Sequence, residues 1–364
     1  MTEQNILKFR LYNQHITHTP LSNPADVVKR LGAVQAQDYL GSLWAIGIRT
    51  PMATEKDIEK AIEDKIIVRT WPMRGTLHFV AASDVKWMLQ LLASRVISGR
   101  RGRLKQLEID DAILARSKKI LVNALQGGKR LTRYVLFQLL ETAKIATADQ
   151  RGFHIISQLA MDGTLCFGPR EGKQPTFVLL DEWIPNARTF SRDEALAELA
   201  VRYFTGHGPA TMEDFMWWAG LTKTDAKASL EMVKTQLAQA LVDGKIYWFP
   251  ANMPGITDIK SSAYLLPPFD EYLIGYTNRS SVLDPMNRKQ TISSNGIFYP
   301  TVVVTGKVIS LWKRILKKDS VIIETSPFKP LSKEMKQEVS VAAKRYADFL
   351  GKRLNAKAQS RKEK

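Results

Sequence analysis

The feature that most constrains the fold is an order of elements that occurs three times along the chain: helices, then two strands around a tight turn. The middle copy shows this order most clearly. Apolar residues at helical spacing predict three helices between residues 110 and 162, and Gly163 is placed to end the third. Residues 164–167 and 176–179 then predict a β-hairpin with a turn between them. This order predicts a winged helix-turn-helix.

Several helix starts in these copies carry a capping box, in which a Ser or Thr is followed three residues later by an acidic or amide side chain. Such pairs locate helix N-termini independently of apolar spacing. The third copy ends in strands around Asp243-Gly244, which is a strong hairpin turn signal. The predicted capping boxes are Ser191 with Glu194, Thr211 with Asp214, and Thr147 with Gln150.

The first copy is looser than the other two. A helix is predicted to begin after Asn23, with proline at its first position, and to end at Gly32. The elements expected after it are a helix at residues 40–48, another at 58–62, strands at 66–69 and 76–80 around a wing, and a long helix at 85–97.

Beyond residue 262 the sequence changes character. Short β-rich segments predict a small antiparallel sheet or barrel, and residues 331–354 predict a final amphipathic helix. The fold class expected is therefore α+β. The predicted domains are a first winged helix at 1–105, a second at 106–188, a third at 189–262, and a barrel-like region with the C-terminal helix and a basic tail at 263–364. The β-rich segments are residues 263–266, 297–305, 308–316 and 321–325.

The chain carries 53 Lys and Arg residues against 36 Asp and Glu, a formal net charge of +17. A surplus of this size most often serves binding to a polyanion, and nucleic acid is the partner that fits helix-turn-helix modules. The basic tail is interpreted as a solubilising segment. A cluster between residues 95 and 105 fits nucleic-acid contact and a solvated linker equally well. Its members are Arg95, Arg100, Arg101, Arg103 and Lys105, and the wing of the second copy adds Arg170 and Lys173.

Other sequence features narrow the chemistry. The N-terminus lacks the basic flank and apolar core of a signal peptide, and no apolar run reaches the length of a membrane span, so we expect a cytoplasmic, nucleoid-associated protein. The single cysteine, Cys166, excludes a disulfide within the chain and a thiolate-rich metal site. The five histidines show no zinc-binding spacing. We expect no metal and no cofactor.

Two glutamines, Gln35 and Gln37, stand two residues apart just beyond the first predicted helix. Side chains at this spacing point the same way in extended backbone, and each amide must satisfy two donors and one acceptor. From the residues alone, these amides could cap backbone groups at a turn. Capping is the interpretation that the residues alone favour, and the alternative is a pair that holds a ligand or a water molecule.

Four stretches together resemble the AlkZ/YcaQ family of bacterial DNA glycosylases. The resemblance covers most of the chain, and it is the combination of stretches that is specific. The matching residues are 32–38, 69–78 (Arg-Thr-Trp-Pro-Met-Arg-Gly-Thr-Leu-His), 208–221, and 265–272 (Leu-Leu-Pro-Pro-Phe-Asp-Glu-Tyr), the last continuing through Gly275-Tyr276 to Arg279.

The resemblance implies three tandem winged helices around a small β-barrel, a concave channel for double-stranded DNA, and excision of N7-alkylated purines, in some members including interstrand crosslinks. It implies that Gln35 and Gln37 are the catalytic pair, because the AlkZ-like branch carries Gln-apolar-Gln at this point. The broader-acting branch has an aspartate in place of Gln37, so a narrow range of substrates is expected.

Other residues in the matching stretches could serve either function or structure. For Arg69 and Arg74 these are phosphate contact and bracing of the interior, and for His78 bracing is preferred. Asp270 and Arg279 are expected to form a structural ion pair covered by Tyr272. The adjacent Trp217 and Trp218 are expected to pack in the core.

A glutamine amide does not accept a proton near neutral pH, so this pair can orient water but cannot act as a general base. The leaving group must then already be activated, which predicts activity confined to cationic lesions and a product with an intact abasic strand. The alternatives are a non-catalytic winged-helix DNA-binding protein, resembling a regulator, and a protein-assembly module. A regulator usually binds as a dimer, whereas three winged helices in one chain suit a monomer.

Overall fold

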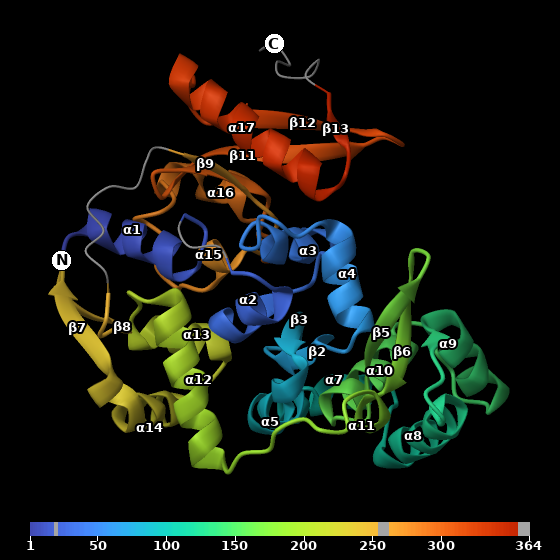
Figure 1. Ribbon diagram of the computed structural model, residues 1–364. Helices are drawn as coiled ribbons and strands as arrows, with labels where there is room; N and C mark the ends of the chain where they lie inside the picture. Colours follow the sequence, from blue (N-terminus) through green and yellow to red (C-terminus); the bar gives the residue numbers. More distant parts are fainter. Residues whose placement is uncertain (18–20, 254–261, 356–364) are drawn as a thin grey trace. The chain divides into compact units, whose positions relative to one another are not determined.

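The computed structural model describes residues 1–17, 21–253 and 262–355. The chain divides into two compact units (Figure 1). The first combines Met1–Ile58 with Ala197–Lys364, and the second is Glu59–Leu196. No helix in the described ranges is long and apolar enough to cross a membrane.

The second unit is built on an antiparallel sheet whose strands run in the order β3-β2-β5-β6-β4. Strand β2 also pairs with β5 through Arg69 and Phe167, so hairpins from two separate parts of the sequence share one sheet. The aromatic rings of Trp71, Phe167 and Phe177 contact one another at tilted angles along the junction. The strands are β2 (Ile67–Met73), β3 (Thr76–Ala81), β4 (Leu131–Thr132), β5 (Leu165–Glu171) and β6 (Gln174–Leu179).

Helix α10 (Arg151–Met161) lies at the centre of this unit. Nine of its eleven residues are buried. It packs against β2, β5, α6 and α8, so it is covered from several directions. The other helices of the unit are α6 (Ser94–Gly99), α7 (Arg101–Gln106), α8 (Asp111–Leu125), α9 (Arg133–Thr142) and α11 (Leu180–Trp183).

The helix predicted at residues 85–97 is present but is not a uniform α-helix. A 3-10 turn (Ala82–Asp84) leads into α5 (Val85–Met88), and a π-helical turn (Leu89–Ala93) separates α5 from α6. Such widened turns are rare inside helices. Apolar spacing predicts a helix here but does not specify which backbone hydrogen-bond pattern each of its turns adopts.

One capping-box prediction is wrong and two are confirmed. Thr147 donates from both its backbone N and its hydroxyl to Glu141, at 2.6 and 2.7 Å, and so does not cap α10. That helix begins instead after Gln150, whose φ is 72°. Thr147 therefore binds the Glu141 carboxylate instead of capping the helix N-terminus. The boxes at Ser191 with Glu194 and at Thr211 with Asp214 form as predicted.

The first unit contains a helical part and a sheet. The helical part brings the N-terminal segment together with the segment after residue 197. Its elements are α1 (Glu3–Asn13), α2 (Pro24–Leu31), β1 (Val34–Gln35), α3 (Tyr39–Gly47), α13 (Met212–Ala219), α14 (Lys223–Val233), a 3-10 turn (Lys234–Gln236) and the hairpin of β7 (Leu237–Val242) and β8 (Lys245–Pro250). Helices α4 (Glu55–Glu63) and α12 (Arg192–His207) contain the points where the two units divide.

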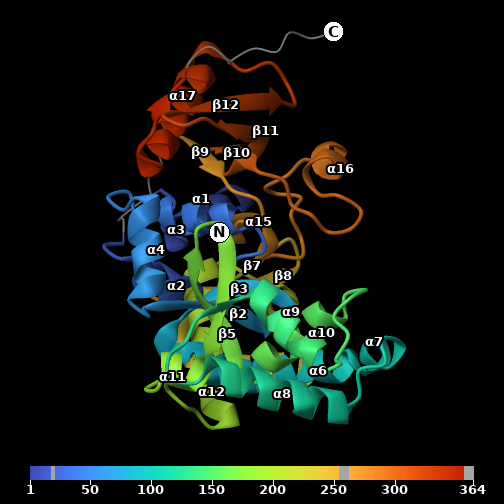
Figure 2. The same cartoon turned by 90° about the vertical axis from the view of Figure 1, so that its right-hand side faces the viewer.

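A five-stranded sheet in the order β13-β12-β11-β10-β9 curls into a half-barrel. Helix α17 (Lys333–Phe349) packs along it, as Figure 2 shows. The rings of Trp44 and Trp312 both meet Tyr346 edge-on, with centroids 5.0 and 5.2 Å away. The strands are β9 (Ala263–Leu266), β10 (Thr301–Val304), β11 (Lys307–Leu316), β12 (Ser320–Pro327) and β13 (Arg353–Leu354), and the short helices between β9 and β10 are α15 (Glu271–Ile274), a 3-10 turn (Pro285–Asn287) and α16 (Arg288–Thr291).

The close approach of α3 to α17 depends on Gly47. A Cβ at this position would lie 2.3 Å from Cε2 of Phe349. We expect Gly47→Ala to lower the free energy of unfolding by about 1–3 kcal/mol, because it overpacks this contact. Adding Phe349→Leu should recover part of the loss, which urea denaturation would measure.

Val341→Ala is the matched control, since Val341 lies on α17 with 62% of its side chain exposed. Its effect should be within about 0.5 kcal/mol. Equal stability of Gly47→Ala and wild type would contradict the proposed close contact.

Candidate active site

The segment that carries Gln35 and Gln37 is held by the end of helix α2. Asn23 caps the start of α2 and Pro24 occupies its first position. Gly32 ends it with a φ of 75°, a conformation that favours glycine. A Cβ on Gly32 would also lie 3.1 Å from Cη2 of Trp218. The chain therefore turns sharply at Gly32 and enters strand β1 close against a buried tryptophan.

Gln35 and Gln37 occupy different environments. Gln35 ends β1 and is 4% exposed, whereas Gln37 lies in a bend and is exposed. The expectation that both side chains point the same way requires extended backbone through both residues, and the extended backbone ends at Gln35. The pair thus combines one buried amide with one that solvent, or a bound molecule, can reach.

Asp38, the next residue, has a structural role. It is the N-cap of α3 and accepts a hydrogen bond from the backbone N of Gly41 at 2.6 Å. It also lies 3.6 Å from the Arg314 guanidinium. The start of α3 and the end of the glutamine segment are therefore fixed by the same carboxylate.

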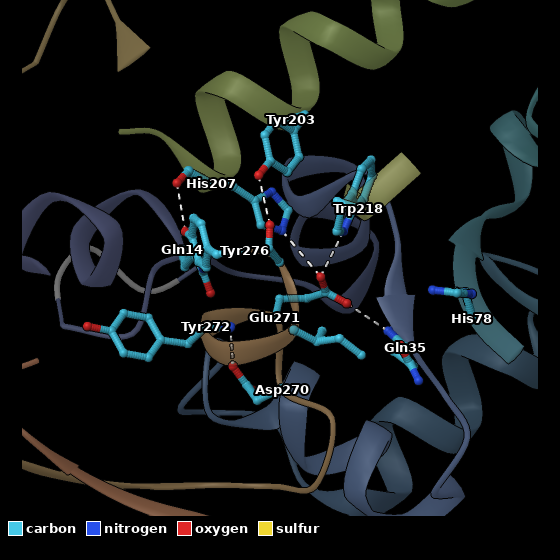
Figure 3. Close-up of polar contacts among 12 residues, drawn as sticks. Gln14, Gln35, His78, Tyr203, His207, Trp218, Asp270, Glu271, Tyr272 and Tyr276 are labelled. Atoms are coloured by element: carbon cyan, nitrogen blue, oxygen red, sulfur yellow. Dashed lines mark hydrogen bonds and ion pairs between the residues drawn. The ribbon is translucent and has the colours of Figure 1, made fainter. Parts of the chain in front are cut away.

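A third side chain, Glu271, meets the glutamine segment from α15. Its Oε1 accepts a hydrogen bond from the backbone N of Gln35 at 3.0 Å. Its Oε2 accepts from Nε1 of Trp218 at 2.9 Å and lies 3.3 Å from Nε2 of His207. Glu271 is 1% exposed. Figure 3 shows one carboxylate oxygen facing Gln35 and the other facing Trp218 and His207.

Aromatic rings pack around His207, whose imidazole lies beside this carboxylate. His207 stacks on Tyr203 with centroids 4.7 Å apart, and the Tyr276 hydroxyl donates to the His207 carbonyl at 2.7 Å. Gln14 donates to that same hydroxyl at 2.9 Å. Burial raises the pKa of both Tyr203 and Tyr276 well above its usual value, so both hydroxyls keep their protons and act as donors.

The ion pair expected between Asp270 and Arg279 is not formed. Asp270 is bound instead by Arg49, whose two terminal nitrogens each donate to one carboxylate oxygen at 2.9 Å. Arg279 donates to the carbonyls of Leu273 and Thr277. Tyr272 is buried and donates to the Gly306 carbonyl. Because Arg49 lies 221 residues from Asp270 along the chain, no local pattern could have indicated this partner.

The tryptophan pair splits between core and surface. Trp218 is fully buried, as expected for core packing, and contributes to the Glu271 site. Trp217 is 46% exposed, and its Nε1 donates to the Ile274 carbonyl at 3.1 Å. The Arg279 guanidinium lies 5.7 Å from the centroid of its ring.

The residues predicted to contact DNA all lie in the second unit. The Arg69 guanidinium lies 4.7 Å from the Phe167 ring centroid, and Arg74 Nη2 lies 3.3 Å from Nε2 of His78, which is buried. Arg100 donates to Ser157 Oγ at 3.0 Å. These contacts show that part of the set also serves the interior of this unit.

Arg170, a further member of the set, also has a partner within the second unit. Burial lowers the pKa of Arg100, and Arg170 is ion-paired with Glu59. The exposed members are Arg101, Arg103, Lys105 and Lys173.

Comparison with known proteins identifies the family of this chain. The family model described as DNA glycosylase AlkZ-like matches residues 28–349. The chain belongs to the AlkZ-like DNA glycosylases. The match includes the glutamine segment, part of each half of the first unit and the whole second unit, and it confirms the resemblance seen in the sequence.

Two comparisons with Streptomyces sahachiroi extend the family match. The interstrand DNA cross-link repair glycosylase of that organism is 26% identical over 359 residues, covering 91% of this chain and 94% of the relative. The solved structure of the S. sahachiroi DNA glycosylase AlkZ superposes with a TM-score of 0.81 at 22% identity, covering 98% of this chain and 99% of that one. This AlkZ-like chain therefore shares the mixed α+β fold with a curled half-barrel sheet and a C-terminal helix.

The sequence reasoning gave no role to Glu271, although the residue lies in a stretch that carried the family resemblance. The sequence did contain a signal for it. Two adjacent carboxylates, Asp270 and Glu271, directly follow an apolar segment, and acidic side chains buried beside such a segment need hydrogen-bond or ionic partners. Nothing in the sequence indicated that the partner would be the backbone of Gln35, 236 residues away.

Removal of the Asp270 carboxylate should destabilise the first unit strongly. Both partners of the Asp270–Arg49 pair are fully buried. Breaking such a pair leaves an uncompensated charge and typically costs about 3–5 kcal/mol. We expect Asp270→Ala to lower the free energy of unfolding by that amount, measured by urea denaturation.

Asp348→Ala removes a carboxylate from an exposed pair with Lys344 in the same unit and should have a much smaller effect. If the two variants lose the same stability, the buried pair does not hold this unit together.

Proposed function

We propose that this AlkZ-like chain is a monofunctional DNA glycosylase that hydrolyses the N-glycosidic bond of cationic N7-alkylated purines, with Gln35 and Gln37 as the catalytic pair. The observation that carries the proposal is the Gln-Ala-Gln segment at the end of β1, in a chain that belongs to the AlkZ-like DNA glycosylases. Gln35 is held by its backbone, whereas Gln37 is exposed.

The chemistry of the proposed substrate fits two neutral amides. An N7-alkylated purine carries a positive charge, so its glycosidic bond is already weakened. The protein then has to position a water molecule and stabilise a cationic sugar, tasks that orientation and electrostatic preorganisation can each assist by several kcal/mol. Amide oxygens can accept hydrogen bonds from that water, and amide NH2 groups can bind the adjacent sugar or phosphate.

We propose that the scaffold consists of three winged helices, at residues 1–105, 106–188 and 189–262, followed by the barrel-like region at 263–364. The second segment supports this best, since its elements follow the order α8, β4, α9, α10, β5, β6. The third follows α12, α13, α14, β7, β8. The first provides α2, α3, α4 and the β2–β3 hairpin.

Double-stranded DNA is the proposed partner, bound by a monomer in the cytoplasm in association with the nucleoid. The net charge of +17 supports phosphate contacts, and binding should weaken steeply with salt. We propose the phosphate ligands from the basic residues of the second unit. They are Arg69, Arg74, Arg100, Arg101, Arg103, Lys105, Arg170 and Lys173, of which Arg101, Arg103, Lys105 and Lys173 are the exposed members.

Crosslinked N7-purines are proposed as a second substrate. The S. sahachiroi relative is named an interstrand DNA cross-link repair glycosylase. Base-processing enzymes usually extrude the target nucleotide, which a crosslinked base cannot undergo. Contacts to the DNA backbone would allow the enzyme to reach the bond without full extrusion.

The competing function is a non-catalytic winged-helix DNA-binding protein. It explains the basic surplus equally well. It gives no reason for the Gln-Ala-Gln segment or for a buried carboxylate bonded to its backbone. The glycosylase is therefore the function that these contacts support best.

The decisive test uses purified protein and duplexes that contain one N7-methylguanine, with alkaline cleavage of the abasic product. We expect Gln35→Ala and Gln37→Ala each to lower the single-turnover rate by roughly 100-fold, the scale seen when one stabilising group is removed from an active site. DNA affinity should be retained.

Gln337→Ala is the matched control, because Gln337 is an exposed glutamine on α17. It should leave the rate unchanged. Full activity in both motif variants would remove Gln35 and Gln37 from catalysis.

The charge of the lesion should decide whether it is excised. A water molecule positioned only by amides is not deprotonated by them, so neutral bases lack the activation that the reaction needs. Duplexes with uracil should yield no abasic sites under conditions that process N7-methylguanine completely. The N7-methylguanine product should keep an intact strand until alkali is added. Excision of uracil, or strand cleavage without alkali, would contradict the proposed mechanism.

A further inference from the structure

Three exposed cations lie around strand β4 in the second unit. Lys129 and Arg130 precede the strand, and Arg133 is the first residue of α9. Their side chains have no ion pair and no hydrogen bond among the residues that the structure describes. Arg100 and Arg170 of the same unit, by contrast, bind other side chains. The charge of the first three is therefore available to a partner outside the chain.

The sheet places a fourth cation near the same strand. Strand β4 pairs with β6, with Thr132 opposite Thr176, and α9 packs against both strands (Figure 1). Arg133 follows Thr132 directly. Lys173 is exposed at the turn between β5 and β6 and lies three residues from Thr176, which is roughly 10 Å of strand. Arg133 and the tip of this wing are thus neighbours in space.

Arg130 lies against the same hairpin. Its neighbour Leu131 pairs with Phe177 of β6. A Cβ built on Gly168 of β5 would lie 3.8 Å from Cδ of Arg130, so the arginine stem reaches β5 while the residue remains exposed. The four cations together form what we call the α9–wing surface. Its members are Lys129, Arg130, Arg133 and Lys173.

The position of Arg133 is unfavourable for the helix that carries it. The N-terminal turn of a helix bears a partial positive charge, which favours acidic side chains and disfavours cations. The first turn of α9 contains no acidic residue and begins with Arg133. The stability of α9 therefore does not explain a cation at this position. A surface that receives an anion from outside does explain it.

Two acids lie beside this surface. The Glu182 carboxylate accepts hydrogen bonds from the backbone N of Gly127 and of Gly128, at 3.4 and 2.7 Å. Glu171 ends β5 at the wing. Neither carboxylate forms an ion pair with a member of the α9–wing surface in the part of the chain that the structure describes. Four cations against these two carboxylates leave a net positive charge.

We propose that the α9–wing surface binds the phosphate backbone of duplex DNA. This inference rests on the proposed DNA-binding function and deepens it: Lys129, Arg130 and Arg133 join Lys173, already a proposed phosphate ligand, in one footprint. Each strand of a duplex carries one phosphate per roughly 3.4 Å of helix axis, so a surface that spans roughly 10 Å meets several phosphates. Such contacts fix the position of a protein on DNA and carry no sequence information.

The experiment measures how the affinity for an undamaged duplex changes with salt. Each phosphate contact contributes about 0.9 to the magnitude of the slope of log K against log salt concentration. Fluorescence anisotropy between about 50 and 200 mM KCl should show that magnitude reduced by about 0.9 in each single variant and about 2.7 in the triple variant. At about 50 mM KCl, each single change should lower the affinity roughly tenfold. The losses should be equal on two duplexes of unrelated sequence. The variants are Lys129→Gln, Arg130→Gln and Arg133→Gln.

Lys60→Gln is the matched control. Lys60 is exposed in the same unit and pairs with Asp64 at 2.9 Å. Its substitution removes the same charge from the protein but should leave the salt slope unchanged. Arg133→Lys keeps a cation at the first position of α9 and should retain the wild-type slope.

A second measurement uses the unaltered protein and does not depend on the folding of a variant. Bound duplex should slow the acetylation of Lys129 by an N-hydroxysuccinimide ester, read by mass spectrometry. Lys60 should react as it does in the free protein. Raising the salt concentration until the duplex dissociates should restore the reactivity of Lys129.

The outcomes separate this surface from the catalytic proposal. A triple variant with the wild-type slope, or a Lys129 that bound duplex does not protect, overturns the α9–wing surface. An equal reduction in slope by Lys60→Gln would reflect net charge alone and also overturns it, as do losses confined to one duplex sequence. A wild-type protein that binds no duplex overturns both proposals. Because these measurements use undamaged DNA, failure to excise N7-methylguanine overturns the glycosylase function alone.

Discussion

Two adjacent carboxylates at the start of α15 hold the first unit and its candidate site together. Asp270 binds Arg49, which follows α3 in the N-terminal segment, and Glu271 binds the backbone of Gln35. Both contacts span more than two hundred residues of sequence. Because buried carboxylates require partners, each bond fixes the N-terminal segment against the segment after residue 197. The position of the glutamine pair depends on these two contacts.

Much of the local structure could be predicted from the sequence. The segments at residues 263–266 and 308–316 became β9 and β11, because apolar alternation and turn residues are local signals. The helix predicted at 331–354 is shorter: α17 ends at Phe349, and Arg353–Leu354 form strand β13 by pairing with β12, a contact that helical spacing cannot indicate. Capping boxes marked two helix starts correctly. The failure at Thr147 shows the limit of such signals, since Glu141 lies close enough to take the same hydrogen bonds. A local sequence pattern does not indicate which of two possible hydrogen-bond partners a side chain will take.

The candidate site could likewise be predicted only in part from the sequence. Family resemblance pointed to Gln35 and Gln37, and the comparisons confirm the family. The chain's own residues could not reveal that one glutamine is buried and the other exposed, because that depends on the bend after β1. They also could not reveal Glu271 behind the pair. Contacts between distant segments are set by packing, and a single sequence records no pairing between its positions.

The burial of α10 has a consequence for how DNA is read. In the winged-helix arrangement that we propose, α10 is the third helix of the second module, the one that in many regulators enters the major groove and contacts base edges. Here nine of its eleven residues are buried against other elements of the second unit. In this module the third helix is largely committed to packing, so under the proposed function its DNA contacts would fall on the phosphate backbone. Phosphate contacts carry no sequence information, which would suit the proposed enzyme, because alkylating agents react at many positions along DNA.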